Sequence, residues 1–155
     1  MTTYYDLHYF IKSRLELQSF IREIINTDVI TNDFEVNNCK TGLALVNINP
    51  TESLDNHILY EVVIEVLDKV DVTDIANSDD YNGGTNIIDV YNTTLASLRK
   101  LHANIKEFKI GNTKYWIQGT PTFEKINDEM LTFRGFRMTF NIQVDDDLTN
   151  VCVNE

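Results

Sequence analysis

The chain has 155 residues, a mass of 17.9 kDa and a formal net charge of −11, which fits one acidic domain. Its composition, 43% hydrophobic and 24% charged, is that of a globular protein and excludes a disordered, collagen-like or low-complexity chain. No apolar run reaches the length of a membrane span, so we expect no membrane partner. Residues 1–6 also lack the basic start and apolar block of a signal peptide.

A long amphipathic helix is predicted over residues 6–26, because apolar residues recur there at spacings of three and four. Asp6 suits the N-cap position, and Asn26-Thr27 suits the end of the helix. The apolar stripe of this helix is expected to pack against a sheet. It comprises Leu7, Phe10, Ile11, Phe20, Ile21, Ile24 and Ile25.

Three strands are predicted next, over residues 33–37, 42–48 and 57–70. Residues 38–41 are expected to turn between the first two strands. Asn49-Pro50 is expected to end the second strand, because proline cannot donate a hydrogen bond to a ladder.

The third of these strands has two unlike faces, because side chains alternate along a strand. One face is wholly apolar and is expected to lie on the core, whereas the other mixes acids with aliphatic residues and is expected to be half wet. The apolar face carries Tyr60, Val62, Ile64 and Val66, and the mixed face carries Leu59, Glu61, Val63, Glu65 and Leu67.

A polar, acidic connection over residues 70–86 leads to a second predicted helix at 86–105. Loops of this length inside compact domains are uncommon and are usually functional or disordered. Thr85 or Asn86 suits the N-cap, and Asp89 places a negative charge in the first turn, where the helix dipole favours it.

Two strands close the chain, one at 114–117 that extends as 122–126, and one at 131–144. The fold expected is α+β, an antiparallel or mixed sheet packed by two helices in the order α-β-β-β-α-β-β. Residues 1–144 would form a single domain with the acidic loop 70–86, followed by an acidic tail, 145–155. The expected core comprises Phe10, Phe20, Ile24, Val62, Ile64, Val66, Leu95, Leu98, Phe136, Phe140 and Ile142.

No pattern in the chain predicts a metal, a cofactor or a catalytic centre. Cys39 and Cys152 form no metal motif and are interpreted as reduced thiols, with a disulfide between them as the alternative. His8, His57 and His102 have no second ligand at metal spacing. Residues 78–83 match a calcium loop poorly, because its first acid is replaced by serine. Glu61 and Glu65 lie about 13 Å apart by strand rise, too far for a glycosidase pair.

Charge is distributed unevenly along the chain. Residues 61–89 hold eight acids and one lysine, whereas residues 90–114 hold five basic residues and one acid. The overall acidity argues against nucleic-acid binding, which needs clustered Lys and Arg. The basic stretch either meets an acidic surface of a neighbouring copy or is a solvated helix end. The interface candidates are Asp71, Asp74, Asp79, Asp80, Arg99, Lys100, Lys106, Lys109, Asp145, Asp146 and Asp147.

The layout resembles the tail-terminator and tail-completion proteins of tailed bacteriophages. The resemblance lies in the N-terminal helix, the Asn49-Pro50-Thr51 strand end, the strand from Tyr60 to Asp71, the acidic loop, and the helix from Ile88 to Leu98. The passage from Leu67 to Asp71 and the closing strand after Gly135-Phe136 are similar to neck and tail proteins of phages that infect Bacteroides-type bacteria.

This resemblance implies a structural virion protein without enzymatic activity, assembled in the host cytoplasm. Copies would form a closed ring at the head–tail junction, six-fold, or twelve-fold in a short-tailed phage neck. The ring would contact portal or connector and tail proteins, and DNA would pass through its lumen without specific binding. The alternatives are a small acid-dependent hydrolase and a monomeric acidic adaptor that binds a basic partner.

Overall fold

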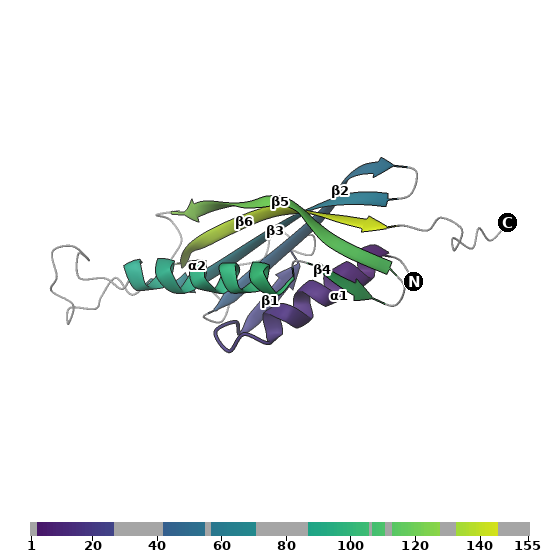
Figure 1. Cartoon of the computed structure of the whole chain (residues 1–155). Helices are drawn as coiled ribbons and strands as arrows, with labels where there is room; N and C mark the ends of the chain where they lie inside the picture. The colour runs from purple at the N-terminus through teal and green to yellow at the C-terminus, as the bar shows by residue number, and fades with distance from the viewer. Residues whose placement is uncertain are drawn as a thin grey trace, which may run out of the picture.

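The computed structural model describes residues 3–26, 42–54, 57–70, 87–105, 107–110, 113–127 and 133–145 (Figure 1). The helices are α1, Thr3–Glu16, and α2, Ile87–Asn104. The described strands form one six-stranded sheet in the order β1-β2-β3-β6-β5-β4. The strands are β1 (Glu23–Asn26), β2 (Leu43–Leu54), β3 (His57–Lys69), β4 (Glu107–Ile110), β5 (Thr113–Ile126) and β6 (Phe133–Asp145).

The predicted α+β class is confirmed, and the sheet is mixed. Strands β1 and β2 are parallel, whereas the other neighbouring strands are antiparallel. The helix predicted at 86–105 and the extended strand predicted over 114–126 both form, as α2 and β5. The strand predicted at 33–37, the loop from residue 71 to 86 and the tail from residue 146 lie outside the described residues.

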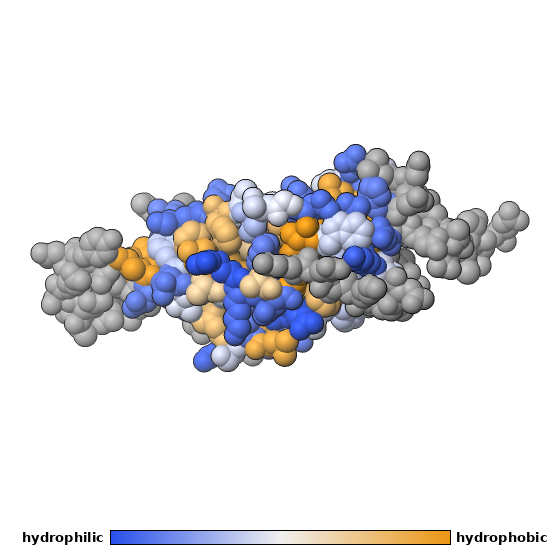
Figure 2. Space-filling model, viewed as in Figure 1, coloured by the Kyte–Doolittle hydropathy of each residue, from blue (hydrophilic) through white to orange (hydrophobic). Residues whose placement is uncertain are grey.

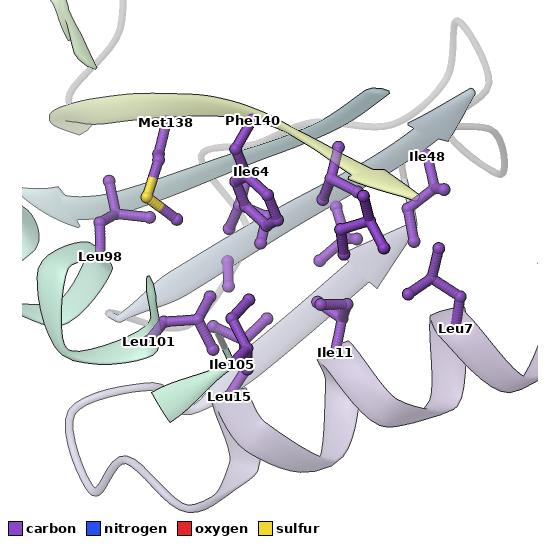
Figure 3. Close-up of a cluster of buried hydrophobic side chains, with 14 of the residues drawn as sticks. Leu7, Ile11, Leu15, Ile48, Ile64, Leu98, Leu101, Ile105, Met138 and Phe140 are labelled. Carbon is purple, nitrogen blue, oxygen red and sulfur yellow. The ribbon is translucent and has the colours of Figure 1, made fainter. Parts of the chain in front are cut away.

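Both helices pack against the same face of the sheet, where the main core lies. Figure 3 shows side chains of α1 and α2 pointing toward side chains from β2, β3 and β6. The predicted alternation of β3 is confirmed, because its apolar face is buried in this cluster while the intervening residues up to Glu65 are half-buried. The labelled residues are Leu7, Ile11 and Leu15 of α1, Leu98 and Leu101 of α2, Ile105 directly after α2, and Ile48, Ile64, Met138 and Phe140 of the sheet.

Some expected core residues are only half-buried. In the view of Figure 2, hydrophobic and hydrophilic residues are interspersed over the described part of the surface. Four of the half-buried residues, all but Leu95, pack against the buried cluster. The half-buried residues are Phe10, Phe20, Ile24, Leu95 and Phe136, whereas Val62, Ile64, Val66, Leu98, Phe140 and Ile142 are fully buried.

The helix predicted to reach residue 26 ends at Glu16, so the sequence prediction is wrong there. A turn follows, in which the amide of Gln18 donates to the Leu15 carbonyl and that of Ile21 to the Gln18 carbonyl. Residues 23–26 then pair with β2 as β1. Isoleucine is β-branched and favours strands, and Ile24 and Ile25 pack against separate clusters of buried side chains, as neighbouring strand residues do.

Strand β2 continues through Pro50, which was expected to end it. Beyond residue 46 no described strand pairs with the outer side of β2, so the missing proline N–H removes no ladder bond there. A register shift between Pro50 and Glu52 and a hydrogen bond from the Tyr4 hydroxyl to the Ile48 carbonyl also block this edge. Pro121 lies in a similar register shift of β5. A proline with an irregular register at a sheet edge discourages pairing with a foreign strand, and β2 and β5 each have this combination.

Strand β4 was not predicted. It has four residues and pairs only with Thr113–Trp116 of β5, which makes it an edge strand of the described sheet. Four residues are too few to show a clear alternation of apolar and polar side chains, so β4 is recognised only from its pairing with β5.

A buried polar pair connects the turn after α1 to α2. The Ser97 hydroxyl donates to Oε1 of Gln18 at 2.6 Å, and Nε2 of Gln18 donates to the Ser97 carbonyl at 3.1 Å. Both side chains are buried. A buried polar atom without a hydrogen-bond partner destabilises the folded state, so this pair favours one position of the turn after α1 relative to α2.

Ser97→Ala is expected to lower the free energy of unfolding by about 2 kcal/mol, because it leaves Oε1 of Gln18 buried without a donor. Urea denaturation measures this loss. Ser13→Ala is the matched control, since the Ser13 hydroxyl is exposed and donates to the Phe10 carbonyl of its own helix. Its expected cost is at most about 0.5 kcal/mol. Equal losses in the two variants would contradict a structural role for the Gln18–Ser97 pair.

Candidate functional site

The structure describes only some of the interface candidates. Arg99 and Lys100 are exposed on α2, Asp145 is exposed at the end of β6, and Lys109 lies in β4. The expected contact between the acidic and basic regions therefore stays a prediction. Outside the described residues lie Asp71, Asp74, Asp79, Asp80, Lys106, Asp146 and Asp147, together with Cys39, Cys152 and the calcium-like stretch 78–83.

The three histidines lie on different elements, and two of them make ring contacts. The ring of His8 meets Tyr4 edge-on, that of His102 meets Phe140 edge-on, and His57 begins β3 opposite Asp145 of β6. Within the described ranges, no three His, Cys, Asp or Glu side chains gather closely enough to hold a metal ion. Among the helices described, none is long and apolar enough to cross a membrane.

The face of the sheet away from the helices carries an ion cluster. Arg137 of β6 lies between Glu65 of β3 and Glu124 of β5, its direct partners in the strand register. Its guanidinium donates to Oε1 of Glu65 from Nε at 2.7 Å and contacts Oε2 of Glu124 from Nη1 at 3.1 Å. The hydrogen bond with Glu65 is the main reason why the pKa of Arg137 is raised. Glu65 is therefore paired with a cation, which is typical of a carboxylate that stabilises the fold.

Arg137→Met is expected to lower the free energy of unfolding by about 1 kcal/mol, because the arginine side chain is more than a third exposed and water screens its ion pairs. The loss should shrink in about 1 M NaCl, where exposed charges are screened. Urea denaturation at low and high salt measures both quantities. A loss that does not change with salt would contradict an electrostatic role for the cluster.

A groove of about 360 Å³ lies between α1 and the edge of the sheet formed by β1 and β2. Tyrosines from the outer side of α1 form one wall, and side chains of β1 and β2 form the other. The lining residues are Tyr4, Tyr5, His8, Tyr9, Lys12, Ile24, Asn26 and Val46. We call this hollow the tyrosine groove.

Two tyrosines of the groove are strongly exposed. The side chains of Tyr5 and Tyr9 are 58% and 54% exposed, their ring centroids lie 4.6 Å apart, and their hydroxyl oxygens are 2.9 Å apart in a hydrogen bond. That bond is the main reason why the pKa of Tyr5 is raised. Lys12, one turn further along α1, adds an exposed ammonium group that lies 3.7 Å from Oε1 of Glu16.

The tyrosine groove therefore combines aromatic surface with hydrogen-bond donors, which suits binding of a partner better than catalysis. Tyrosine offers contact area with a polar tip and is enriched at protein interfaces. Sequence reasoning missed this site. Its signal was the spacing of Tyr5, Tyr9 and Lys12, which share a side of α1 apart from the buried stripe of Leu7, Ile11 and Leu15. The second wall could not be foreseen, because β1 was predicted as helix.

A scan against protein-family models and a search of curated proteins found no match to this chain.

Proposed function

We propose that this chain is a structural protein of a tailed-bacteriophage virion and forms a ring at the head–tail junction, as a tail terminator or neck ring. The resemblance in sequence layout supports this proposal. So does the arrangement of an N-terminal helix, a long central strand, a second helix and a long closing strand in one α+β sheet. The ring would have six or twelve copies and would contact portal or connector and tail proteins.

The observation that carries the proposal is the position of exposed aromatic residues at both edges of the sheet. Tyr5 and Tyr9 lie on α1 beside β1, at one end of the strand order, and Phe123 lies on β5, toward the other end. A ring of identical subunits joins two different patches of each subunit. Aromatic residues are the side chains most enriched in such contacts.

The net charge is consistent with a lumen that passes DNA. At −11 the chain repels the phosphate backbone, which keeps DNA from sticking to a channel wall. DNA would therefore move through the ring without specific binding.

Electron microscopy of the purified protein tests the proposal, because the ring has a visible central hole and the alternatives do not. We expect ring-shaped class averages at a protein concentration high enough for assembly. Particles that stay monomeric at every concentration would contradict ring formation and would favour an acidic adaptor or a small hydrolase instead.

Reversing charge in the acidic loop should impair assembly while the monomer still folds. Lysine at Asp71, Asp74, Asp79 and Asp80 would repel the basic residues Arg99 and Lys100 of a neighbouring copy. Each exposed ion pair contributes at most about 1 kcal/mol to assembly. The loss of assembly therefore depends on all four reversed charges together, and it should be smaller at high salt. Sedimentation velocity measures the assembled fraction. Normal assembly of the reversed variant would exclude this loop as an interface.

A further inference from the structure

The tyrosine groove differs in charge from the chain as a whole. The chain has 24 acidic residues and a net charge of −11, yet none of the described residues that line the groove is an acid, and one of them is Lys12. Lys12 pairs with Glu16 at 3.7 Å, but both side chains are more than half exposed, and an exposed pair of this kind is weak. The ammonium group of Lys12 can therefore pair with the carboxylate of a ligand in the groove.

Hydrogen bonds and ring contacts hold the aromatic wall of the groove in one arrangement. The Tyr4 hydroxyl donates to the Ile48 carbonyl at 3.1 Å, and the ring of His8 meets that of Tyr4 edge-on. Tyr5 and Tyr9 contact each other through their rings and their hydroxyls, so a ligand lies against these rings and not between them. A wall that is already ordered loses little side-chain entropy when a ligand binds, which favours binding.

The exposure of this wall indicates the kind of ligand. Small-molecule sites bury about 70–90% of the ligand surface. Tyr5 and Tyr9 are each more than half exposed, so the groove is open on their side and encloses a small molecule less completely than that. A protein segment can instead place one apolar side chain in the hollow of about 360 Å³, while the rest of its protein covers the outer surface of both tyrosines.

The spacing of the groove residues along α1 matches that of an extended chain. The midpoint between Tyr5 and Tyr9 lies about 7.5 Å from Lys12 along the helix axis, at the rise of an α-helix. Side chains two residues apart in an extended chain lie on the same side, about 6.7 Å apart. A segment can therefore place an apolar side chain beside the tyrosines and a carboxylate at Lys12 when one residue separates the two.

We propose that the tyrosine groove binds an extended segment of a partner protein that carries an apolar side chain and, two residues away, a carboxylate. The apolar side chain lies against Ile24 and Val46, which line the groove from β1 and β2, and the carboxylate pairs with Lys12. This inference goes beyond the proposed ring and does not depend on it, because a single chain contains the whole groove.

Short capped peptides test this recognition. The probes are acetyl-Phe-Ala-Glu-amide and its reversed order, acetyl-Glu-Ala-Phe-amide, so that both chain directions are covered. Each probe has two matched controls, one with glutamine in place of glutamate and one with alanine in place of phenylalanine. Nuclear magnetic resonance titration of the isotope-labelled full chain, at a concentration where it is monomeric, measures the affinity and locates the peptide.

We expect one of the two probes to bind and to shift the amide signals of the groove residues in α1 and β1. Glutamine in place of glutamate should weaken binding about threefold, as loss of an exposed ion pair does. Alanine in place of phenylalanine should weaken it at least about tenfold, a loss typical of an aromatic anchor. At high salt the glutamate and glutamine peptides should bind equally, because salt screens the ion pair.

Variants of the chain assign these effects to the groove. Lys12→Gln should bind the glutamate and glutamine peptides equally, whereas Lys100→Gln, which changes an exposed lysine of α2 outside the groove, should keep the threefold preference. Tyr5→Ala with Tyr9→Ala should weaken both peptides. Tyr4 is retained because its hydroxyl bonds the Ile48 carbonyl. Circular dichroism melting confirms that each variant is folded.

Three results would overturn the inference. Equal binding of the glutamate and glutamine peptides to the wild-type chain at low salt would contradict recognition by Lys12. Signal shifts outside the groove, or no shift at millimolar peptide, would show that the groove is not the site. Groove shifts that appear without peptide as the protein concentration rises would mean that a second copy occupies it.

The inference and the proposed function fail in different ways, because electron microscopy measures ring formation separately. Rings formed by a chain that binds neither peptide would reject the groove inference alone. Peptide binding by a chain that stays monomeric at every concentration would reject the ring alone.

Discussion

Ile64→Ala is expected to lower the free energy of unfolding by about 3 kcal/mol, because it leaves a cavity at the centre of the core. Ile64 is fully buried in the middle of β3, opposite Val46 of β2 and Met138 of β6. Its side chain lies on the sheet face that both helices cover (Figure 3). Urea denaturation measures the loss as a shift in midpoint at constant slope.

Val63→Ala is the control for this prediction, because Val63, the residue before Ile64 in β3, points to the opposite face and is half-buried. Its expected cost is about 1 kcal/mol, from partial loss of apolar contact and of strand propensity. If Val63→Ala cost as much as Ile64→Ala, the faces of β3 would be assigned wrongly, since a slip by one residue exchanges them.

Gly135→Ala is expected to destabilise the protein by about 3 kcal/mol or to prevent folding. Gly135 of β6 is buried against β3, and an added Cβ would collide with the carbonyl oxygen of Val66 and lie 3.1 Å from Cα of Leu67. These are backbone atoms of a central strand, so they cannot rotate away as a side chain would. Overpacking a rigid site costs 1–3 kcal/mol or more.

Gly119→Ala separates this steric effect from the conformational effect of glycine. Gly119 has φ of +68°, but a Cβ there would meet no atom within 4 Å. Only the left-handed backbone conformation disfavours alanine there, and it should lower the free energy of unfolding by about 1 kcal/mol. Thermal melting of the two variants compares them directly. A cost for Gly119→Ala that matches or exceeds that of Gly135→Ala would contradict the close approach of β6 to β3.

The sequence predicted those elements that have a long, regular pattern. The alternation from Tyr60 to Val66 revealed which face of β3 is buried, and the stripe of α2 revealed the second helix. Strand β6 was recognised for the same reason, because apolar and polar residues alternate along it from Phe136 to Val144.

Short elements and edges could not be read in the same way. Residues 23–26 continue the helical spacing of α1, yet they pair with β2, and only that tertiary contact makes them a strand. Pro50 signals the end of a central strand, but at an edge it costs no ladder bond. The tyrosine groove depends on β1 as its wall, so the error at β1 also hid the candidate site.

Native mass spectrometry of the purified chain over rising concentration tests ring formation most directly, because it counts subunits. A closed ring predicts that one species of fixed copy number, six or twelve, replaces the monomer without a ladder of larger products, since closure leaves no patch unpaired. A monomer at every concentration, a dimer as the largest species, or an open series that grows without limit would contradict the ring.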